Sequence, residues 1–108
     1  MRPMAALPEV ITANMEEIRA LCEKHGVKRL AVFGSAVKGT FDPDESDLDF
    51  VVEFFPVALI DRGRAQLAMI ESLESMLGRP VDLVDLTFVR NPYFREELDE
   101  TQRELYAA

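Results

Sequence analysis

Two aspartates at alternate positions, Asp47 and Asp49, are the residues of this sequence best suited to chemistry. Leu48 separates them, and the apolar residues 50–52 follow. In an extended strand, side chains two positions apart share a face, so both carboxylates are predicted to lie on one side. Like charges at such short range repel each other unless a cation neutralises them. Hard carboxylate oxygens favour Mg²⁺ or Mn²⁺, ions that keep several waters and bridge to substrate phosphates.

A third carboxylate and a glycine–serine pair extend this pattern. Asp82 lies in a short apolar run that is predicted to form the neighbouring strand. Three carboxylates suffice to hold two metal ions roughly 3.5–4 Å apart. Gly34 and Ser35 end the apolar run of residues 30–33. The glycine allows a sharp turn and a close approach to a ligand, and the serine hydroxyl and nearby amides are suited to holding a phosphate.

Each motif alone has an ordinary structural explanation. Asp-x-Asp also describes two solvent-facing residues on a strand, and Gly-Ser also describes a common turn. Their order is more specific, because a strand, Gly-Ser, a short loop and an apolar strand carrying Asp-x-Asp follow one another. This combination predicts a metal and phosphate site.

Three other residues are predicted to lie outside this site. His25 is the one histidine and lies at a predicted helix end, so histidine acid–base chemistry and a zinc site are not expected. Cys22 falls on an apolar helical stripe and is predicted to fill the core. Asp85, three positions beyond Asp82, is predicted to face the other way and to act as a loop or helix-cap residue.

Hydrophobic periodicity places the motifs on predicted helices and strands. Apolar residues at helical spacing alternate with short apolar runs bounded by glycine or proline. Gly26 is predicted to end the first helix in a left-handed conformation. The predicted elements are a helix over residues 8–25, a strand over 27–33, a strand from 48 that closes at 54–56, a helix through 65–76, a strand over 80–85, and a terminal helix from 92 to about 106.

The lengths of the connections predict the topology. The link between the first two strands is too short for a crossover helix, so these strands should be antiparallel. A full helix separates the second and third strands, which can therefore be parallel through a right-handed crossover. We expect an α+β (mixed α/β) fold, a small mixed sheet with helices packed against it, in one domain spanning residues 1–108.

The charge balance argues against extended nucleic acid as a partner. The formal net charge is −8, with 12 basic and 20 acidic residues. Proteins that bind long DNA or RNA usually neutralise its phosphates with a basic surface. The single cysteine cannot form an internal disulfide, and no apolar run has the length of a signal peptide core or a membrane span. We therefore expect a cytoplasmic protein with no membrane association.

Four stretches of the sequence together resemble a known family. They are, in chain order, Phe33-Gly34-Ser35, Lys38-Gly39, Ser46-Asp47-Leu48-Asp49 and Val81-Asp82-Leu83-Val84. These stretches resemble the motifs of the minimal nucleotidyltransferases, which belong to the DNA polymerase β-like nucleotidyltransferase superfamily. The resemblance extends over nearly the whole chain, because Gly78-Arg79-Pro80 before the last of these stretches and the tail from Arg95-Glu96-Glu97-Leu98 through Tyr106 also look like the family. It implies the nucleotidyltransferase fold.

The resemblance implies that the Gly-Ser turn binds nucleotide. Gly34 and Ser35 would bind the β- and γ-phosphates of ATP, with Lys38 as a further phosphate-binding residue. Lys38 stands where the family usually has arginine, so the positive charge is kept but the bidentate fork is lost. The loop between Ser35 and Asp47 is one residue longer than is usual in the family, and a loop insertion of this kind is inexpensive.

The resemblance also implies that the three aspartates are catalytic. Asp47 and Asp49 would hold the metal ions, two Mg²⁺ in the usual arrangement. Asp82 would ligate the catalytic metal and help to activate the attacking hydroxyl. The implied reaction transfers AMP from ATP to a hydroxyl acceptor and releases pyrophosphate.

The implied partners are ATP and another protein. Members that resemble this chain are often antitoxins paired with a helical HEPN-domain toxin, so the implied acceptor is a tyrosine of such a toxin. A different class of function stays open, a non-catalytic binding antitoxin that neutralises its partner by occlusion. Homo-oligomerisation also stays open.

Overall fold

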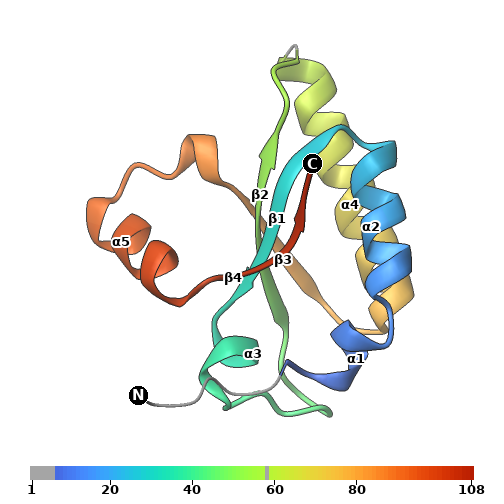
Figure 1. Cartoon of the computed structure of the whole chain (residues 1–108), viewed down its shortest axis with the longest axis vertical. Coiled ribbons are helices and arrows are strands. Elements are labelled where there is room, and N and C mark those ends of the chain that lie inside the picture. Colours follow the sequence, from blue (N-terminus) through green and yellow to red (C-terminus); the bar gives the residue numbers. More distant parts are fainter. Residues whose placement is uncertain (1–6, 58) are drawn as a thin grey trace.

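A mixed four-stranded sheet forms the centre of the protein in the computed structural model, which describes residues 7–57 and 59–108. Helices lie on both faces of this sheet (Figure 1). The elements are, in chain order, α1 (Glu9–Thr12), α2 (Met15–Lys24), β1 (Val27–Phe33), α3 (Ser35–Lys38), β2 (Leu48–Phe54), α4 (Leu59–Leu77), β3 (Val81–Asp85), the 3₁₀ helix η1 (Leu86–Phe88), α5 (Pro92–Thr101) and β4 (Arg103–Ala107).

The order of strands across the sheet is β3-β2-β1-β4. β1 and β2 are antiparallel and β2 and β3 are parallel, which confirms the topology predicted for these three strands. The register pairs Phe33 with Asp49 and Asp49 with Asp82. The end of β1 and the starts of β2 and β3 therefore meet at one end of the sheet.

The prediction of a terminal helix reaching residue 106 is wrong in its last third. α5 ends at Thr101, and β4 follows and pairs antiparallel with β1. The interval from Leu98 to Leu105 fits two helical turns, but alternate residues in β4 fit a strand equally well. Pairing with β1 satisfies backbone groups that would otherwise be unpaired at that edge, and this tertiary gain decides the conformation.

The predicted first helix is broken in two. α1 and α2 are separated at residues 13–14, where the side-chain amide of Asn14 donates to the Val10 carbonyl at 2.7 Å. Asparagine side chains compete for backbone groups in this way, and so favour helix ends over helix interiors. Gly26 after α2 has a φ of 66°, which confirms the predicted left-handed end.

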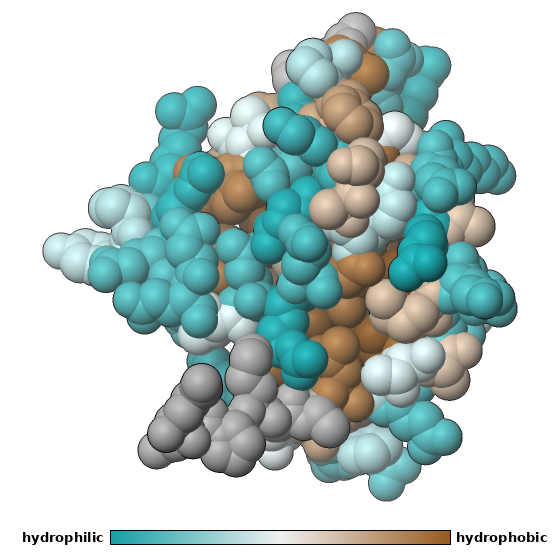
Figure 2. Space-filling view, in the orientation of Figure 1, coloured by the Kyte–Doolittle hydropathy of each residue, from teal (hydrophilic) through white to brown (hydrophobic). Residues whose placement is uncertain are grey.

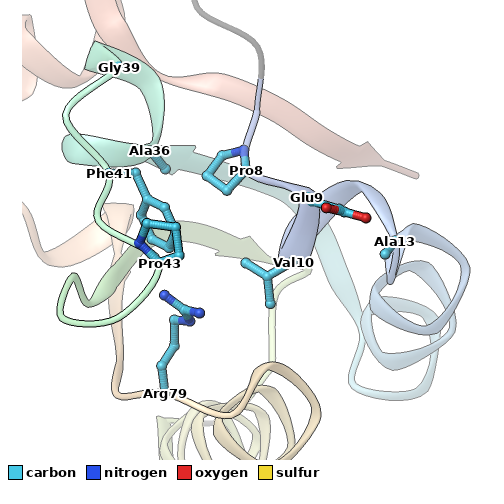
Figure 3. A pocket seen from close by; sticks show the side chains of 9 residues that line it. All are labelled: Pro8, Glu9, Val10, Ala13, Ala36, Gly39, Phe41, Pro43 and Arg79. Atoms are coloured by element: carbon cyan, nitrogen blue, oxygen red, sulfur yellow. The ribbon is translucent and has the colours of Figure 1, made fainter.

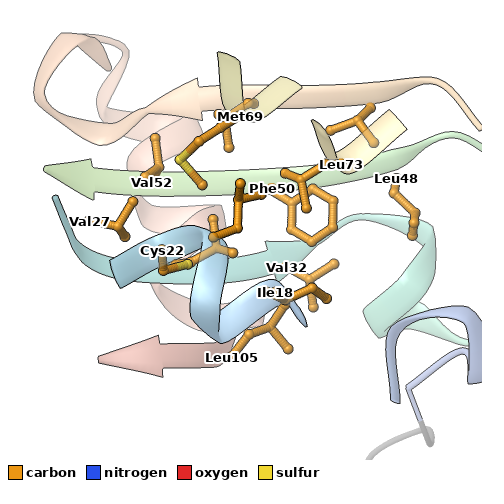
Figure 4. Packing of buried hydrophobic residues seen from close by; sticks show 14 of the residues in the cluster. Ile18, Cys22, Val27, Val32, Leu48, Phe50, Val52, Met69, Leu73 and Leu105 are labelled. Atoms are coloured by element: carbon orange, nitrogen blue, oxygen red, sulfur yellow. The ribbon is translucent and has the colours of Figure 1, made fainter. Parts of the chain in front are cut away.

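The larger core lies between the sheet and the helices α2 and α4. Ile18 of α2, Met69 and Leu73 of α4, and Phe50 and Val32 of the sheet are all fully buried there (Figure 4). Burial of such side chains contributes about 1.5–3 kcal/mol each relative to exposure. This face therefore fixes the positions of β1 and β2 on which the aspartates depend.

A smaller core lies on the opposite face of the sheet, under α5. Leu98 of α5 packs there with Ala31, Val51 and Leu86. Asp49 is two positions before Val51 on β2, so it shares this face. The sheet thus presents a carboxylate to the space beside α5, while Leu48 and Phe50 point into the larger core.

The surface over α5 is mostly hydrophilic (Figure 2). Apolar side chains reach the surface between the sheet and α2 in the same view. Within the described part of the chain, no helix is both long and apolar enough to cross a membrane.

Candidate active site

Gly34 brings the backbone into close contact with a carboxylate. It follows β1 directly and has a φ of 72°, a conformation that residues with a side chain rarely adopt. A Cβ built on Gly34 would lie 2.6 Å from Oδ2 of Asp49, much closer than ordinary packing permits. The position therefore requires glycine for two reasons, the left-handed backbone and the approach to Asp49.

The carboxylates of β2 and β3 lie side by side. Asp49 and Asp82 are paired in the parallel register, and Asp47 immediately precedes β2. Asp49 is half-buried, whereas Asp47 and Asp82 are exposed. Burial raises the pKa of the Asp49 carboxyl above its usual value, and the charges of Asp82 and Asp47 raise it further. The structure thus brings the three predicted aspartates within electrostatic reach of one another.

Three basic side chains of the described residues pair with carboxylates outside this group. Arg29, Lys38 and Arg62 form ion pairs with Glu104, Glu97 and Asp85, respectively. Carboxylates that lie close enough to raise the pKa of one of them form a site where a cation gains by binding.

The donor set of the three aspartates fits Mg²⁺. In the described residues, no three ligating side chains converge into a ready-made metal cage. Mg²⁺ does not require one, because it keeps several waters and is typically held by one or two carboxylates together with substrate phosphates. Two exposed carboxylates beside a half-buried one meet this requirement.

Ser35 begins the short helix α3 beside these carboxylates. The amides of Val37 and Lys38 donate to the Gly34 carbonyl at 3.0 and 3.1 Å, which closes the turn. The first amides of a helix, here those of Ser35 and Ala36, have no acceptor within it. Ser35 and these amides directly follow Gly34, the residue that approaches Asp49.

Lys38 forms an ion pair with a residue of α5, an interaction that the sequence did not indicate. Its ammonium nitrogen lies 3.2 Å from Oε1 of Glu97, on α5. Both side chains are about half exposed, at 52% and 55%. The pair joins the end of α3 to α5 across the side of the sheet that carries Asp49.

The longer loop between β1 and β2 is closed by its own hydrogen bonds. The Asp42 amide donates to the Ser46 hydroxyl at 2.8 Å, and the Ser46 amide donates to the Asp42 carbonyl at 2.9 Å. The Asp42 carboxylate also accepts from the Asp44 amide at 2.9 Å. Such turns accommodate loop residues locally, and both Ser35 and Asp47 keep their places at its two ends.

The structure places the remaining candidates outside the site. Cys22 is fully buried in the larger core, and this burial raises the pKa of its thiol to about 12. His25 follows α2, and partial burial followed by the charge of Lys24 lowers its pKa. Asp85 faces away from Asp82, is buried, and accepts from the Thr87 amide at the start of η1, as predicted for a helix cap.

The position of one residue beside the site was not predicted from the sequence. Arg79 lies in the turn before β3 and reaches the loop that leads into Asp47, where its guanidinium lies 4.8 Å from the ring centre of Phe41. These two residues are 38 positions apart (79 − 41), so no local pattern could have connected them.

The fold and the site together define a nucleotidyltransferase, in which a glycine–serine turn meets carboxylates at the ends of a mixed sheet. The family model described as "Nucleotidyltransferase domain" matches residues 15–105. The chain belongs to this family.

Several named proteins are similar to this chain. It is 34% identical over 101 residues to "Putative protein adenylyltransferase MJ1379" of Methanocaldococcus jannaschii, covering 90% of this chain and 95% of the relative. It is 34% identical over 84 residues to the protein adenylyltransferase MntA of Thermococcus cleftensis, covering 78% of each.

A solved complex shows the same fold. It is that of a tri-AMPylated Shewanella oneidensis HEPN toxin with an MNT antitoxin, and a chain of it matches with a TM-score of 0.63 and 22% identity. The match covers 90% of this chain and 72% of that chain. At this identity, the likeness establishes the fold of the sheet and its helices.

Proposed function

We propose that this protein transfers AMP from ATP to a hydroxyl group of a partner protein. The observation that carries the proposal is the contact of the Gly34 backbone with Asp49, which is itself in register with Asp82. A phosphate-holding turn and two carboxylates thereby meet at one end of the sheet. The similarity to proteins named protein adenylyltransferase supports a protein as the acceptor.

The proposed reaction is an in-line displacement at phosphorus. The acceptor oxygen forms a bond to the α-phosphorus of ATP, and the bond from that phosphorus to the bridging α–β oxygen breaks, so pyrophosphate leaves. The hydroxyl proton passes to a carboxylate, for which Asp82 is the proposed acceptor because it is exposed and neighbours Asp49. Such a reaction depends mainly on positioning and charge neutralisation, and so needs no histidine.

Asp47, Asp49 and Asp82 are the residues proposed to hold Mg²⁺, with two ions expected. When bound, the metal would neutralise phosphate charge and lower the pKa of the attacking hydroxyl. Ser35 and the amides of α3 would hold the β- and γ-phosphates, and Lys38 would add a positive charge if it left Glu97.

A HEPN-type toxin is the proposed partner, and a toxin tyrosine is the proposed acceptor. The tri-AMPylated HEPN toxin in the solved complex of a similar fold supports this proposal. The net charge of −8 would attract a basic protein surface and would speed the encounter with it. The protein would then act as the antitoxin of the pair.

A transfer assay tests the proposal. The purified protein is incubated with Mg²⁺, ATP labelled in its α-phosphate, and the product of the neighbouring gene. We expect label on the partner, at the hydroxyl of a tyrosine, and loss of labelling when EDTA removes the metal. Absence of label on the partner at any Mg²⁺ concentration would rule the proposal out.

The same assay separates catalysis from simple occlusion. The double variant Asp47→Asn, Asp49→Asn removes two charges but keeps the shapes of both side chains. If AMP transfer neutralises the partner, the double variant should fail to protect cells from it while still binding it. Protection equal to that of the wild type would instead support a non-catalytic antitoxin.

A further inference from the structure

The turn that precedes β3 holds the chain on both sides of Asp47. The carbonyl of Pro80 accepts from the Leu48 amide at 3.2 Å, immediately after Asp47. Nη1 of Arg79 donates to the Ser46 carbonyl at 3.4 Å, immediately before it. Asp47 therefore lies between two contacts from adjacent residues of a single turn.

The same turn leads directly into the strand that carries Asp82. Pro80 is two positions before Asp82, so the turn connects the two carboxylates through a short and stiff segment. The backbone contacts around Asp47 consequently set its position relative to Asp82.

The loop before Asp47 is closed by its own hydrogen bonds and packs on the larger core through Phe41. A cavity of about 610 Å³ lies beside it, lined by Phe41, Pro43 and Arg79 together with Val10 and other residues of α1 and α3. Figure 3 shows the Arg79 side chain pointing towards Phe41 and Pro43 from the opposite side of this cavity. The guanidinium, which lies over the Phe41 ring at 4.8 Å from its centre, ties this loop to the turn before β3.

The environment of Arg79 is not one that stability alone would favour. Its Nε is buried without a hydrogen-bond partner among the described residues, and none of the recorded ion pairs includes it. A buried donor that lacks an acceptor is unfavourable, and such a group in a native structure calls for another explanation.

We propose that Arg79 is a positioning residue for the metal site, which fixes Asp47 at the distance from Asp82 and Asp49 that metal binding requires. The inference rests on the proposed role of Asp47 as a metal ligand. It goes beyond the residues proposed to bind metal or phosphate, because Arg79 acts through Phe41 and the Ser46 carbonyl.

Binding of Mn²⁺ tests this inference without requiring transfer. Free Mn²⁺ is measured by electron paramagnetic resonance during a titration in the presence of AMP-PNP, for the wild type, Arg79→Met, Arg79→Lys and Phe41→Leu. Arg64→Met is the matched control, because Arg64 is exposed on α4 and this substitution also removes one positive charge from the protein. Thermal unfolding is recorded for each metal-free protein.

We expect Arg79→Met to weaken Mn²⁺ binding about tenfold, the size of effect typical for residues that orient metal ligands. Arg79→Lys should lie between it and the wild type, Phe41→Leu should show a smaller loss, and Arg64→Met should show none. The melting temperature of Arg79→Met should change little, since the lost contacts are offset by removal of the unpartnered Nε. In the transfer assay, the half-saturating Mg²⁺ concentration should rise by a similar factor, and high Mg²⁺ should restore the rate.

Equal Mn²⁺ affinity of the wild type and Arg79→Met would overturn the inference, whatever the transfer activity. A loss of affinity that merely follows a fall in the folded fraction would also overturn it. If Arg79→Met does not fold, Arg79→Lys and Phe41→Leu decide by the same criterion. A wild type that binds Mn²⁺ more tightly than Arg79→Met but transfers no AMP would refute the proposed function and leave the inference standing.

Discussion

Asp82 and Asp85 lie three residues apart on the same strand and have opposite environments. Asp82 is exposed beside Asp49, whose pKa it helps to raise. Asp85 is 5% exposed, and its Oδ2 lies 2.7 Å from Nε of Arg62. One aspartate adds to a concentration of negative charge, and the other is neutralised within the fold.

The groups around Asp85 satisfy one another. Arg62 also donates to the Thr87 hydroxyl at 3.0 Å, and its guanidinium lies within 6 Å of the rings of Phe54 and Phe88, at 5.8 and 5.7 Å. Asp85 in turn accepts from the Thr87 amide at 3.0 Å. This arrangement fixes η1 against α4, and it leaves no charge for a ligand to neutralise.

A structural carboxylate and a proposed functional one differ in this protein in how their charges are compensated. The charge of Asp85 is compensated inside the molecule, so its removal should harm the fold. The charges of Asp47 and Asp82 instead raise the pKa of Asp49, so removal of any of these three charges should harm activity and leave the fold intact or improved.

The largest expected effect is on activity. Asp82→Asn should reduce the rate of AMP transfer about 10³-fold, because a metal-binding and proton-accepting charge is lost. The melting temperature should stay within about 2 °C of the wild type, as for other substitutions of exposed groups. Labelled-ATP transfer and calorimetry measure the two quantities, and a large fall in melting temperature would contradict the distinction from Asp85.

The second effect is on stability. Asp85→Asn leaves a mostly buried Arg62 without its counter-ion, and should lower the free energy of unfolding by about 3 kcal/mol. For a domain of this size, the melting temperature should fall by roughly 10–20 °C. Urea denaturation gives the free energy. The folded variant should bind Mn²⁺ as the wild type does, and weaker binding would show that the two ends of β3 are coupled.

The third effect depends on pH and is seen without metal. Because the pKa of Asp49 in the folded protein is raised above its ordinary value of 3.8, the folded state holds more protons than the unfolded state between these two pKa values. The stability of the metal-free protein contributed by this group therefore falls as pH rises through that window.

Asp49→Asn removes this effect, so the metal-free variant should be more stable than the wild type at neutral pH. The difference should shrink as pH falls through the raised pKa towards 3.8. Thermal unfolding in EDTA at several pH values provides the measurement, with Asp44→Asn in the exposed loop as the control. A lower melting temperature for Asp49→Asn at neutral pH would contradict the account of the site.

The smallest effect concerns the exposed pair of Lys38 and Glu97. Glu97→Gln should change the free energy of unfolding by less than about 0.5 kcal/mol, because exposed ion pairs contribute little. If Lys38 serves the phosphates, its release from Glu97 should lower the KM for ATP about twofold at low salt, while Lys38→Met should raise it. These shifts should diminish at high salt, and an unchanged KM in both variants would remove Lys38 from the nucleotide site.

Local patterns were sufficient to predict the parts of the fold that local physics controls. The alternation after Asp47 predicted β2 and its buried face, and the helix length before β3 predicted that β2 and β3 are parallel. The spacing of Leu98 and Leu105 led to the wrong prediction of a helix up to residue 106, because it fits two helical turns as well as a helix followed by a strand. Asn14 could have signalled the break between α1 and α2, since its side chain favours helix ends.

The sequence by itself determined that three aspartates and a glycine–serine turn occur on predicted strand ends, and that the chain is acidic. Only the tertiary structure decided that Gly34 touches Asp49, that Asp85 is neutralised by Arg62, and that Arg79 reaches the loop before Asp47. These contacts join residues that are at least 15 positions apart in the sequence, so they depend on strand register and on the packing of α4. A short window of sequence contains the periodicity of each element, but it does not contain the distances between elements.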